Sequence, residues 1–302
     1  MQGRDERQGI IYAALAYTLW GFLPIYWKLM DNVSAGEILA HRIIWAFIFM
    51  VCLVVGLRKG PLFLKDCASI LKDKKKWIGI SLAGIVISIN WLIYIWAVNS
   101  GHIVQASLGY YINPLVSILL GIIVLKESFT KRQVFSFLLA GIGVIYLTVS
   151  YGVFPWVSLA LAFSFGLYGL LKKTVDIGAM FGLTIETMVV TPIALICLFF
   201  IPNNTFQTGL FLSETGIFLI GGGIVTAIPL LLFAGGAKKI PLSMIGFLQY
   251  IAPTLMLLLG IFLYREVFSI EHLISFAFIW VALIVYMGST YRREKWLSEK
   301  QD

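Results

Sequence analysis

Two stretches of this sequence, YINPLVSILLGIIVLKESFTKRQVFSF at residues 111–137 and YIAPTLMLLLGIFLYREVFSIEHLISF at residues 250–276, are identical at 11 of 27 positions without a gap. The matches that a shared apolar composition does not explain are Pro114 with Pro253, Gly121 with Gly260 and Glu127 with Glu266. The same offset aligns residues 84–86 with residues 223–225, all Gly-Ile-Val. The chain therefore divides into two related halves, residues 1–150 and 151–302.

The composition places both halves in a membrane. Of the 302 residues, 60% are hydrophobic and only 13% are charged, and the mean hydropathy is +0.92. A soluble domain is nearer a quarter charged, so a cytosolic enzyme or a nucleic-acid-binding protein is excluded on composition. The first apolar run, residues 9–30, is longer than the core of a cleavable signal peptide and indicates a first membrane span.

About 20 apolar residues in a helix cross a hydrocarbon core of about 30 Å. Ten segments meet that length, which predicts an all-α integral membrane protein with ten transmembrane helices. The predicted spans are residues 9–30, 36–57, 77–98, 103–125, 133–150, 154–171, 180–201, 216–234, 242–264 and 270–291.

The basic residues set the predicted orientation. With the N-terminus on the cytoplasmic side, 20 of the 23 Lys and Arg residues lie in cytoplasmic segments and only Arg265 lies in an outer loop. By the positive-inside rule, this bias places both termini in the cytoplasm of a multi-pass protein of a bacterial-type cell membrane. The net charge of +8 is thereby attributed to topology and not to an anionic macromolecular partner.

Each half carries five predicted spans, and an odd number inserts the two halves with opposite orientations. Inverted five-helix repeats are typical of secondary transporters, which bind a small-molecule substrate near the middle of the bilayer. The alternative is a non-transporting membrane protein, such as a lipid scramblase or a small-molecule sensor.

Several stretches resemble the drug/metabolite transporter superfamily of EamA type, and most closely its RarD-like branch. These are residues 20–24, 37–42 (EILAHR), 90–91, 107–115 (SLGYYINPL) and 246–254 (GFLQYIAPT). The resemblance covers nearly the whole chain and implies transport of a small organic solute, often its export. One departure is that Ser136 and Ser275 stand where the wider family often has glycine.

Polar and aromatic side chains near the twin prolines are the predicted substrate site, because small-molecule pockets combine aromatic walls with a few hydrogen-bonding groups. Pro114, Pro229 and Pro253 are predicted helix kinks; the alternative for these residues is helix packing and an interfacial aromatic belt. The predicted substrate-binding residues are Trp20, Arg42, Asn90, Trp91, Tyr94, Tyr110, Tyr111, Asn113, Gln249 and Tyr250.

Ionisable groups inside a span are costly and mark candidate function. Arg42 could neutralise an anionic group of the substrate, or it could serve structure by reaching the interface. Glu37, His41 and Glu186 are candidates for proton coupling. Glu186 is alternatively a counter-ion for Arg42 or a group near the inner water interface. For Glu37 the competing interpretation is a cap at the helix N-terminus.

Other chemistries find no support in the sequence. It has no P-loop motif, no H-E-x-x-H zinc motif and no G-x-S-x-G nucleophile motif. Cys52, Cys67 and Cys197 have no metal-binding spacing. We therefore expect no enzyme activity, no cofactor, no metal and no nucleic-acid partner, and membrane lipids as the only further contact. The oligomeric state is left open.

Overall fold

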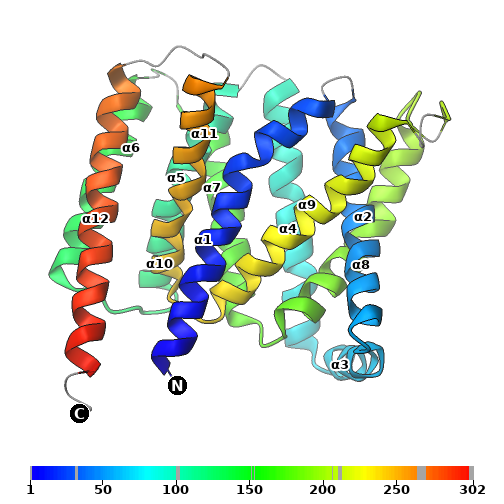
Figure 1. Cartoon of the computed structure of the whole chain (residues 1–302), viewed down its shortest axis with the longest axis horizontal. Coiled ribbons are helices and arrows are strands. Elements are labelled where there is room, and N and C mark those ends of the chain that lie inside the picture. The colour runs from blue at the N-terminus through cyan, green and yellow to red at the C-terminus, as the bar shows by residue number, and fades with distance from the viewer. Residues whose placement is uncertain are drawn as a thin grey trace.

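The computed structural model describes residues 2–30, 33–99, 103–150, 152, 154–205, 207–209, 213–263 and 270–298; at residues 2–3, 95, 98–99, 103–107 and 290–298 it describes the backbone alone. Every regular element in these ranges is a helix (Figure 1). The helices are α1 (Gln2–Trp27), η1 (Lys28–Met30), α2 (Ala35–Gly56), α3 (Gly60–Lys72), α4 (Lys74–Asn99), α5 (Ile103–Ile123), α6 (Lys131–Ser150), α7 (Trp156–Thr174), α8 (Ala179–Phe200), α9 (Glu214–Ala237), α10 (Leu242–Gln249), α11 (Ile251–Phe262) and α12 (Ile270–Ser298).

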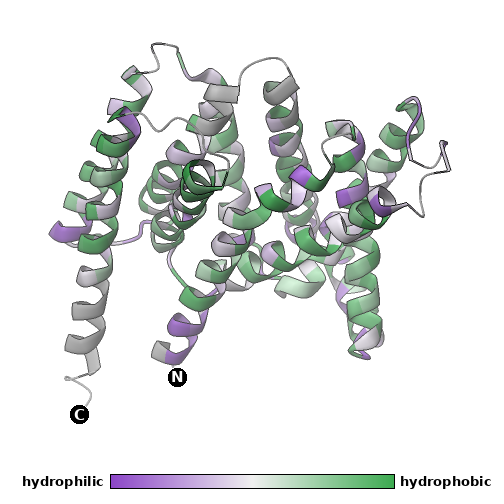
Figure 2. Ribbon diagram, turned by 45° about the horizontal axis from the view of Figure 1, so that its top comes forward, coloured by the Kyte–Doolittle hydropathy of each residue, from purple (hydrophilic) through white to green (hydrophobic). Residues whose placement is uncertain are grey.

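The prediction of an all-helical membrane protein is confirmed. In the described ranges, eight helices have the length and composition to cross a membrane. The described apolar part of α5, Leu108–Ile123, is shorter, and α7 ends in the charged pair Lys172-Lys173. Large apolar side chains are exposed around the outside of the bundle, and apolar residues run along most helices while hydrophilic ones gather near their ends (Figure 2). In a bilayer these exposed side chains contact lipid.

The helices pack in a regular order. The α6–α12 pair stands at one edge of the bundle and the α2–α8 pair at the other (Figure 1). Between them, α1 contacts α9 and α11, while α7 contacts α4 and α5. Both termini lie at the same end of the bundle (Figure 1).

The segment between α2 and α4, which joins the predicted spans 36–57 and 77–98, contains the additional helix α3. Pro61 stands near its N-terminus, where a missing N–H costs no intrahelical bond. Phe63 packs edge-on against Phe181 of α8, with ring centroids 5.4 Å apart, whereas Leu64 and Leu71 are exposed. The helix lies across the end of the bundle that carries both termini (Figure 1).

Of the three prolines predicted to kink a helix, only Pro253 lies next to an interruption of its helix. The helix is interrupted between Gln249 and Ile251, so that α10 and α11 are separate elements just before Pro253. Proline removes the hydrogen bond to the carbonyl four residues earlier, which here belongs to Gln249. By contrast, α5 and α9 continue through Pro114 and Pro229 as single helices, so the twin helix break expected from the sequence is present on one side only.

Close helix approach depends on glycine at two positions that the internal repeat aligns. A Cβ on Gly84 of α4 would lie 3.1 Å from the carbonyl oxygen of Glu186 in α8. A Cβ on Gly223 of α9 would overlap the backbone of Trp45 and Ala46 in α2. Glycine therefore lets these helix backbones approach each other.

We expect Gly223→Ala to lower the stability of the folded protein by about 1–3 kcal/mol, since the new methyl group meets backbone that cannot rotate away. Thermal unfolding in detergent measures the change. Gly141→Ala in α6 is the matched control, because a Cβ there meets nothing within 4 Å. Equal melting temperatures for the two variants would contradict the assigned contact.

Candidate functional site

A cavity of about 200 Å³ lies between α1, α2, α4, α5, α7, α9, α10 and α11. Its residues come from the second half of α1 and α4 and the first half of α5 and α7. Since α1 begins at the end of the bundle that carries the termini, the cavity lies in the half remote from that end. Nine predicted residues line it: Trp20, Arg42, Asn90, Trp91, Tyr94, Tyr110, Asn113, Gln249 and the kink residue Pro253.

The wall formed by α1 includes residues that the sequence analysis missed. Tyr17, Trp20, Pro24 and Trp27 all line the cavity. Their spacing of three, four and three residues places them on one face of a helix. An aromatic stripe at this spacing was the signal available in the sequence, and only Trp20 was selected from it.

Aromatic rings close the cavity toward the end that carries the termini. Phe233 of α9 stacks on Tyr168 of α7, with centroids 5.7 Å apart and an interplanar angle of 15°. Phe165 lies 5.9 Å from Trp20 in an edge-on arrangement, and Trp20 lies 5.8 Å from Phe233. This cluster fills the space between α1, α7 and α9 on that side of the cavity.

Arg42 of α2 is the one charged side chain among the described residues that line the cavity. Its Cζ lies 4.7 Å from the ring centroid of Trp27 and 4.9 Å from that of Trp91. Its Nε donates a hydrogen bond to Oγ1 of Thr226, 3.1 Å away. Thr226, another residue that the sequence analysis missed, thus holds the guanidinium between two indole rings.

The amide side chains in the cavity wall have different surroundings. Asn90 donates from Nδ2 to the carbonyl oxygen of Leu161 at 2.9 Å and to Oγ of Ser164 at 2.8 Å. Gln249 donates from Nε2 to Oγ of Ser117 at 3.1 Å. The buried Oδ1 of Asn113 accepts no hydrogen bond from the described residues. Asn90 and Gln249 thereby join helices as well as line the cavity.

Tyr111 and Tyr250 lie outside the cavity, unlike their neighbours Tyr110 and Gln249. Both are buried in an apolar cluster, where Tyr111 meets Phe276 of α12 edge-on at 5.2 Å. Successive residues on a helix point about 100° apart, so the face that turns Tyr110 into the cavity turns Tyr111 into the core. The structure therefore does not bring Tyr111 and Tyr250 to the cavity that Tyr110 and Gln249 line.

Glu186 is not the counter-ion of Arg42. Its Oε1 accepts a hydrogen bond from Nζ of Lys172 at 2.6 Å, and both side chains are buried. The hydroxyl of Tyr168 donates to Oε2 at 3.3 Å. Lys172 lies just after the predicted span 154–171, and its proximity to Glu186 depends on how α7 and α8 both pack against α4 and α9.

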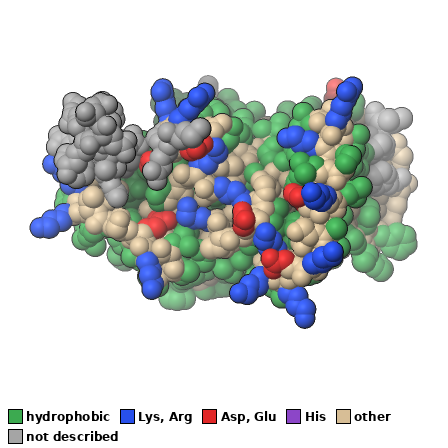
Figure 3. Space-filling view, turned by 90° about the horizontal axis from the view of Figure 1, so that it is seen from below, with side chains coloured by type: hydrophobic (Ala, Val, Ile, Leu, Met, Phe, Trp, Pro, Cys, Tyr) green, Lys and Arg blue, Asp and Glu red, His purple; other side chains and the backbone are tan. Residues whose placement is uncertain are grey.

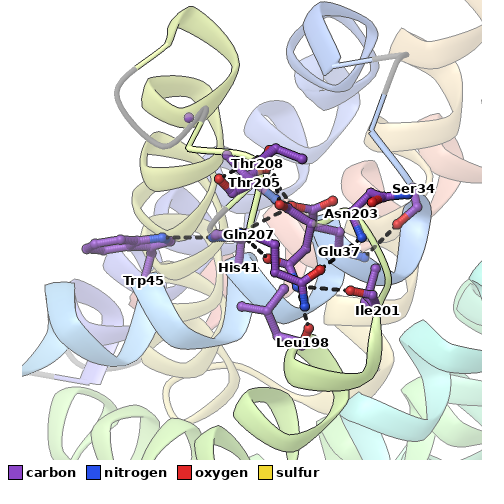
Figure 4. A network of polar contacts seen from close by, with 12 residues as sticks. Ser34, Glu37, His41, Trp45, Leu198, Ile201, Asn203, Thr205, Gln207 and Thr208 are labelled. Atoms are coloured by element: carbon purple, nitrogen blue, oxygen red, sulfur yellow. Dashed lines mark hydrogen bonds and ion pairs between the residues drawn. The ribbon is translucent and has the colours of Figure 1, made fainter.

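Glu37 and His41 belong to a network that joins α2 to the segment after α8 (Figure 4). Oε1 of Glu37 accepts hydrogen bonds from the backbone N–H and the hydroxyl of Thr205, at 2.6 and 2.5 Å. His41 accepts one from Nε1 of Trp45 at 3.1 Å, and its Nε2 lies 3.8 Å from Oε1 of Glu37. Neither residue lines the cavity. The contacts of Glu37 favour the structural interpretation of this residue.

The match to a family model supports the resemblance found in the sequence. Residues 7–149 match the model of the EamA-like transporter family. The chain is 47% identical over 296 residues to a protein named "Uncharacterized transporter YojE" from Bacillus subtilis (strain 168), covering 98% of each chain. It is 43% identical over 297 residues to "Protein RarD" of Escherichia coli (strain K12), covering 98% of this chain and 99% of that protein.

A solved crystal structure has the same fold. It superposes with a TM-score of 0.73, covering 93% of this chain and 97% of the other, at 17% sequence identity. At this identity the likeness concerns the arrangement of the helices alone.

We expect Glu37→Ala to destabilise the protein by about 1–3 kcal/mol, because the buried N–H of Thr205 loses its acceptor. Thermal unfolding in detergent measures this loss. Glu214→Ala is the control, since Glu214 also stands in the first turn of a helix but is exposed. An unchanged melting temperature for Glu37→Ala would contradict the structural role.

Proposed function

The chain belongs to the EamA-like transporter family, and from this premise we propose that it is a secondary transporter of a small organic solute. It binds the solute in the aromatic cavity and moves it across the cytoplasmic membrane by alternating access, in the direction of export. The observation that carries the proposal is a cavity with one cation and aromatic walls, inside a membrane-spanning bundle of a transporter family. Of the 21 residues that line the cavity, nine are among those predicted from the sequence.

The helix contacts support two inverted five-helix repeats. Adding 139 to the bounds of α5 gives the first residue of α10 and the last of α11. If α1, α2, α4, α5 and α6 correspond to α7, α8, α9, α10–α11 and α12, then α2–α8, α5–α10 and α6–α12 are contacts between equivalent helices. The contact of α1 with α9 then has its equivalent in that of α7 with α4.

The aligned glycines support the same correspondence. Gly84 brings α4 onto α8, and Gly223 brings α9 onto α2, which are equivalent contacts under an exchange of the two halves. In this proposal α5 and α7 complete a set of ten spans. Five spans in each half give the halves opposite orientations in the membrane.

The distribution of basic residues supports a cytoplasmic location for both termini. Lys and Arg side chains are spread over the face of the bundle that carries the termini (Figure 3). These include residues of α3 and of the connection between α5 and α6. A cytoplasmic face rich in Lys and Arg follows the positive-inside rule. The cavity then lies in the outer half of the protein.

Several polar contacts hold the proposed cytoplasmic side closed. Glu127 accepts hydrogen bonds from the backbone N–H groups of Leu242 at 2.6 Å and Ser243 at 3.0 Å, at the start of α10. Lys173 donates to the carbonyl oxygen of Ile240 at 2.7 Å. Alternating access requires these contacts to break when the cavity opens to the cytoplasm.

The local backbone explains how Glu127 reaches α10. Lys126 has φ of 54°, a left-handed conformation, and the N–H of Glu127 donates to the carbonyl oxygen of Gly121 at 3.1 Å. This arrangement terminates a helix and turns the chain sharply. The carboxylate of Glu127 then meets the positive end of another helix, where a negative charge is favourable.

The cavity as the substrate site is tested by a pair of tryptophan variants in α4. Trp91 lines the cavity, whereas Trp96 is exposed and contacts Trp156. In proteoliposomes that hold the protein in the inside-out orientation, we expect Trp91→Ala to reduce the rate of solute uptake at least tenfold. Trp96→Ala is expected to leave this rate near that of the wild type. A panel of labelled metabolites and drugs identifies the transported solute first.

Melting temperatures of both variants separate loss of transport from loss of fold. If the wild-type protein moves no member of the panel, the transporter proposal fails. If both variants are folded and take up solute at the same rate, the cavity does not lie on the transport pathway.

We propose Glu186 as the site of proton coupling, supported by its burial and by its pairing with Lys172 behind the aromatic cluster. Protonation of the carboxylate would release Lys172 and so break the ion pair that joins α7 to α8. Ion pairs of this kind are held together in the membrane because each separated charge is costly there.

Glu186→Gln is expected to abolish the response of uptake to an imposed pH gradient and to leave solute exchange without a gradient largely intact. Uptake with and without the gradient measures the effect. Glu214→Gln is the control, since this carboxylate is exposed on α9. A variant Glu186→Gln that still responds to the gradient would exclude Glu186 as the coupling group.

A further inference from the structure

We propose that the cavity selects organic anions, and that Arg42 binds the carboxylate, or an equivalent planar anion, of a solute with a small apolar body. This proposal rests on the proposed function, in which the cavity is the substrate site. It adds the chemical class of the solute.

The geometry of Arg42 leaves the outer edge of its guanidinium available. Trp27 and Trp91 lie over the cation at 4.7 and 4.9 Å, and Nε is engaged by Thr226. In the described part of the chain, this is the one hydrogen bond that Arg42 makes. The four N–H groups on its two terminal nitrogens are therefore free to bind a ligand.

The energetics of this position favour an anionic ligand. A cation in a membrane interior without a counter-ion is costly, and two cation–π contacts of about 0.5–2 kcal/mol each offset only part of that cost. The terminal edge of a guanidinium matches two oxygens of a carboxylate in a pair of parallel hydrogen bonds. A bound carboxylate would supply the missing counter-charge.

The protein itself offers no competing anion among the described residues. No acidic side chain lines the cavity. Glu186 is already paired with Lys172, and Glu37 is engaged by Thr205. Both carboxylates lie on helices next to the cavity, so their other engagements leave Arg42 as the one uncompensated charge at the site.

The rest of the cavity defines the body of the anion. Its volume of about 200 Å³ is below the roughly 300–1,000 Å³ of pockets for drug-sized ligands. Tyr17, Trp20 and Phe165 contribute further aromatic side chains to the walls. A single ring or a short branched chain beside the carboxylate fits these walls.

Matched pairs of acids and amides test the proposal, because each pair has nearly the same shape and differs in charge. The probes are benzoate and benzamide, phenylacetate and phenylacetamide, and cyclohexanecarboxylate and cyclohexanecarboxamide, each titrated onto the purified full-length protein in detergent at pH 7. We expect at least one acid to raise the melting temperature in a saturable manner, and its amide to have at least tenfold lower affinity.

Three variants assign the effect to Arg42. Arg42→Gln is expected to lose the preference for the acid. Arg42→Lys is expected to retain it in part, since a lysine keeps the charge but lacks the planar pair of parallel N–H donors. Thr226→Val removes only the acceptor of Nε and is the milder variant if Arg42→Gln does not fold; it weakens binding of the acid more than that of the amide. Lys28→Gln, outside the cavity, is the control and leaves the preference unchanged.

The proposal is overturned if an acid and its amide bind equally, if no acid binds, or if Arg42→Gln and Thr226→Val both keep the preference while folded. None of these outcomes affects the transport measured with the Trp91 and Trp96 variants. A wild-type protein that transports only neutral solutes would therefore exclude anion selectivity and retain the transporter. Failure of all transport would instead refute the proposed function.

Discussion

In a hydrocarbon environment a polar side chain has to find its partners inside the protein, and most of this structure satisfies that constraint. Glu186 is paired with Lys172, Glu37 with Thr205, and Gln249 with Ser117. Each of these contacts joins two different elements, and the pairs Glu37–Thr205 and Gln249–Ser117 also lie far apart in the sequence. Arg42 differs, because its cation has aromatic neighbours and one hydroxyl acceptor but no carboxylate partner in the described residues.

This difference separates the polar groups that are paired within the protein from the one that we propose to bind an anionic solute. The satisfied groups join helices to one another, and Glu186 and Gln249 combine this with the roles that we propose for them in proton coupling and in the cavity. Arg42 lies beside a cavity instead, where the unmet charge is accessible to a solute. The same constraint applies near the end of the bundle that carries the termini, where Glu127 and Lys173 bond to backbone groups at the start of α10 and in the connection between α9 and α10.

Much of the architecture is predictable because it depends on local composition. Runs of about 20 apolar residues predict helices whatever their neighbours are, and the eight qualifying helices agree closely with the predicted segments. Most predicted cavity residues line the cavity, since polar residues in an apolar span tend to face inward. Tyr111 and Tyr250 face the core because successive residues of a helix point in different directions. The partner of Glu186 was not predictable because it comes from another helix.

By itself, the sequence determined the membrane-spanning helical class, the internal repeat and the family, because hydropathy and residue identity are properties of the chain. Only the tertiary structure decided which helix faces meet. It places Trp27, Trp91 and Thr226 around Arg42. It also pairs Glu186 with Lys172 and not with Arg42. These contacts depend on helix rotation and crossing, which packing between distant segments sets and which spacing along the chain does not encode.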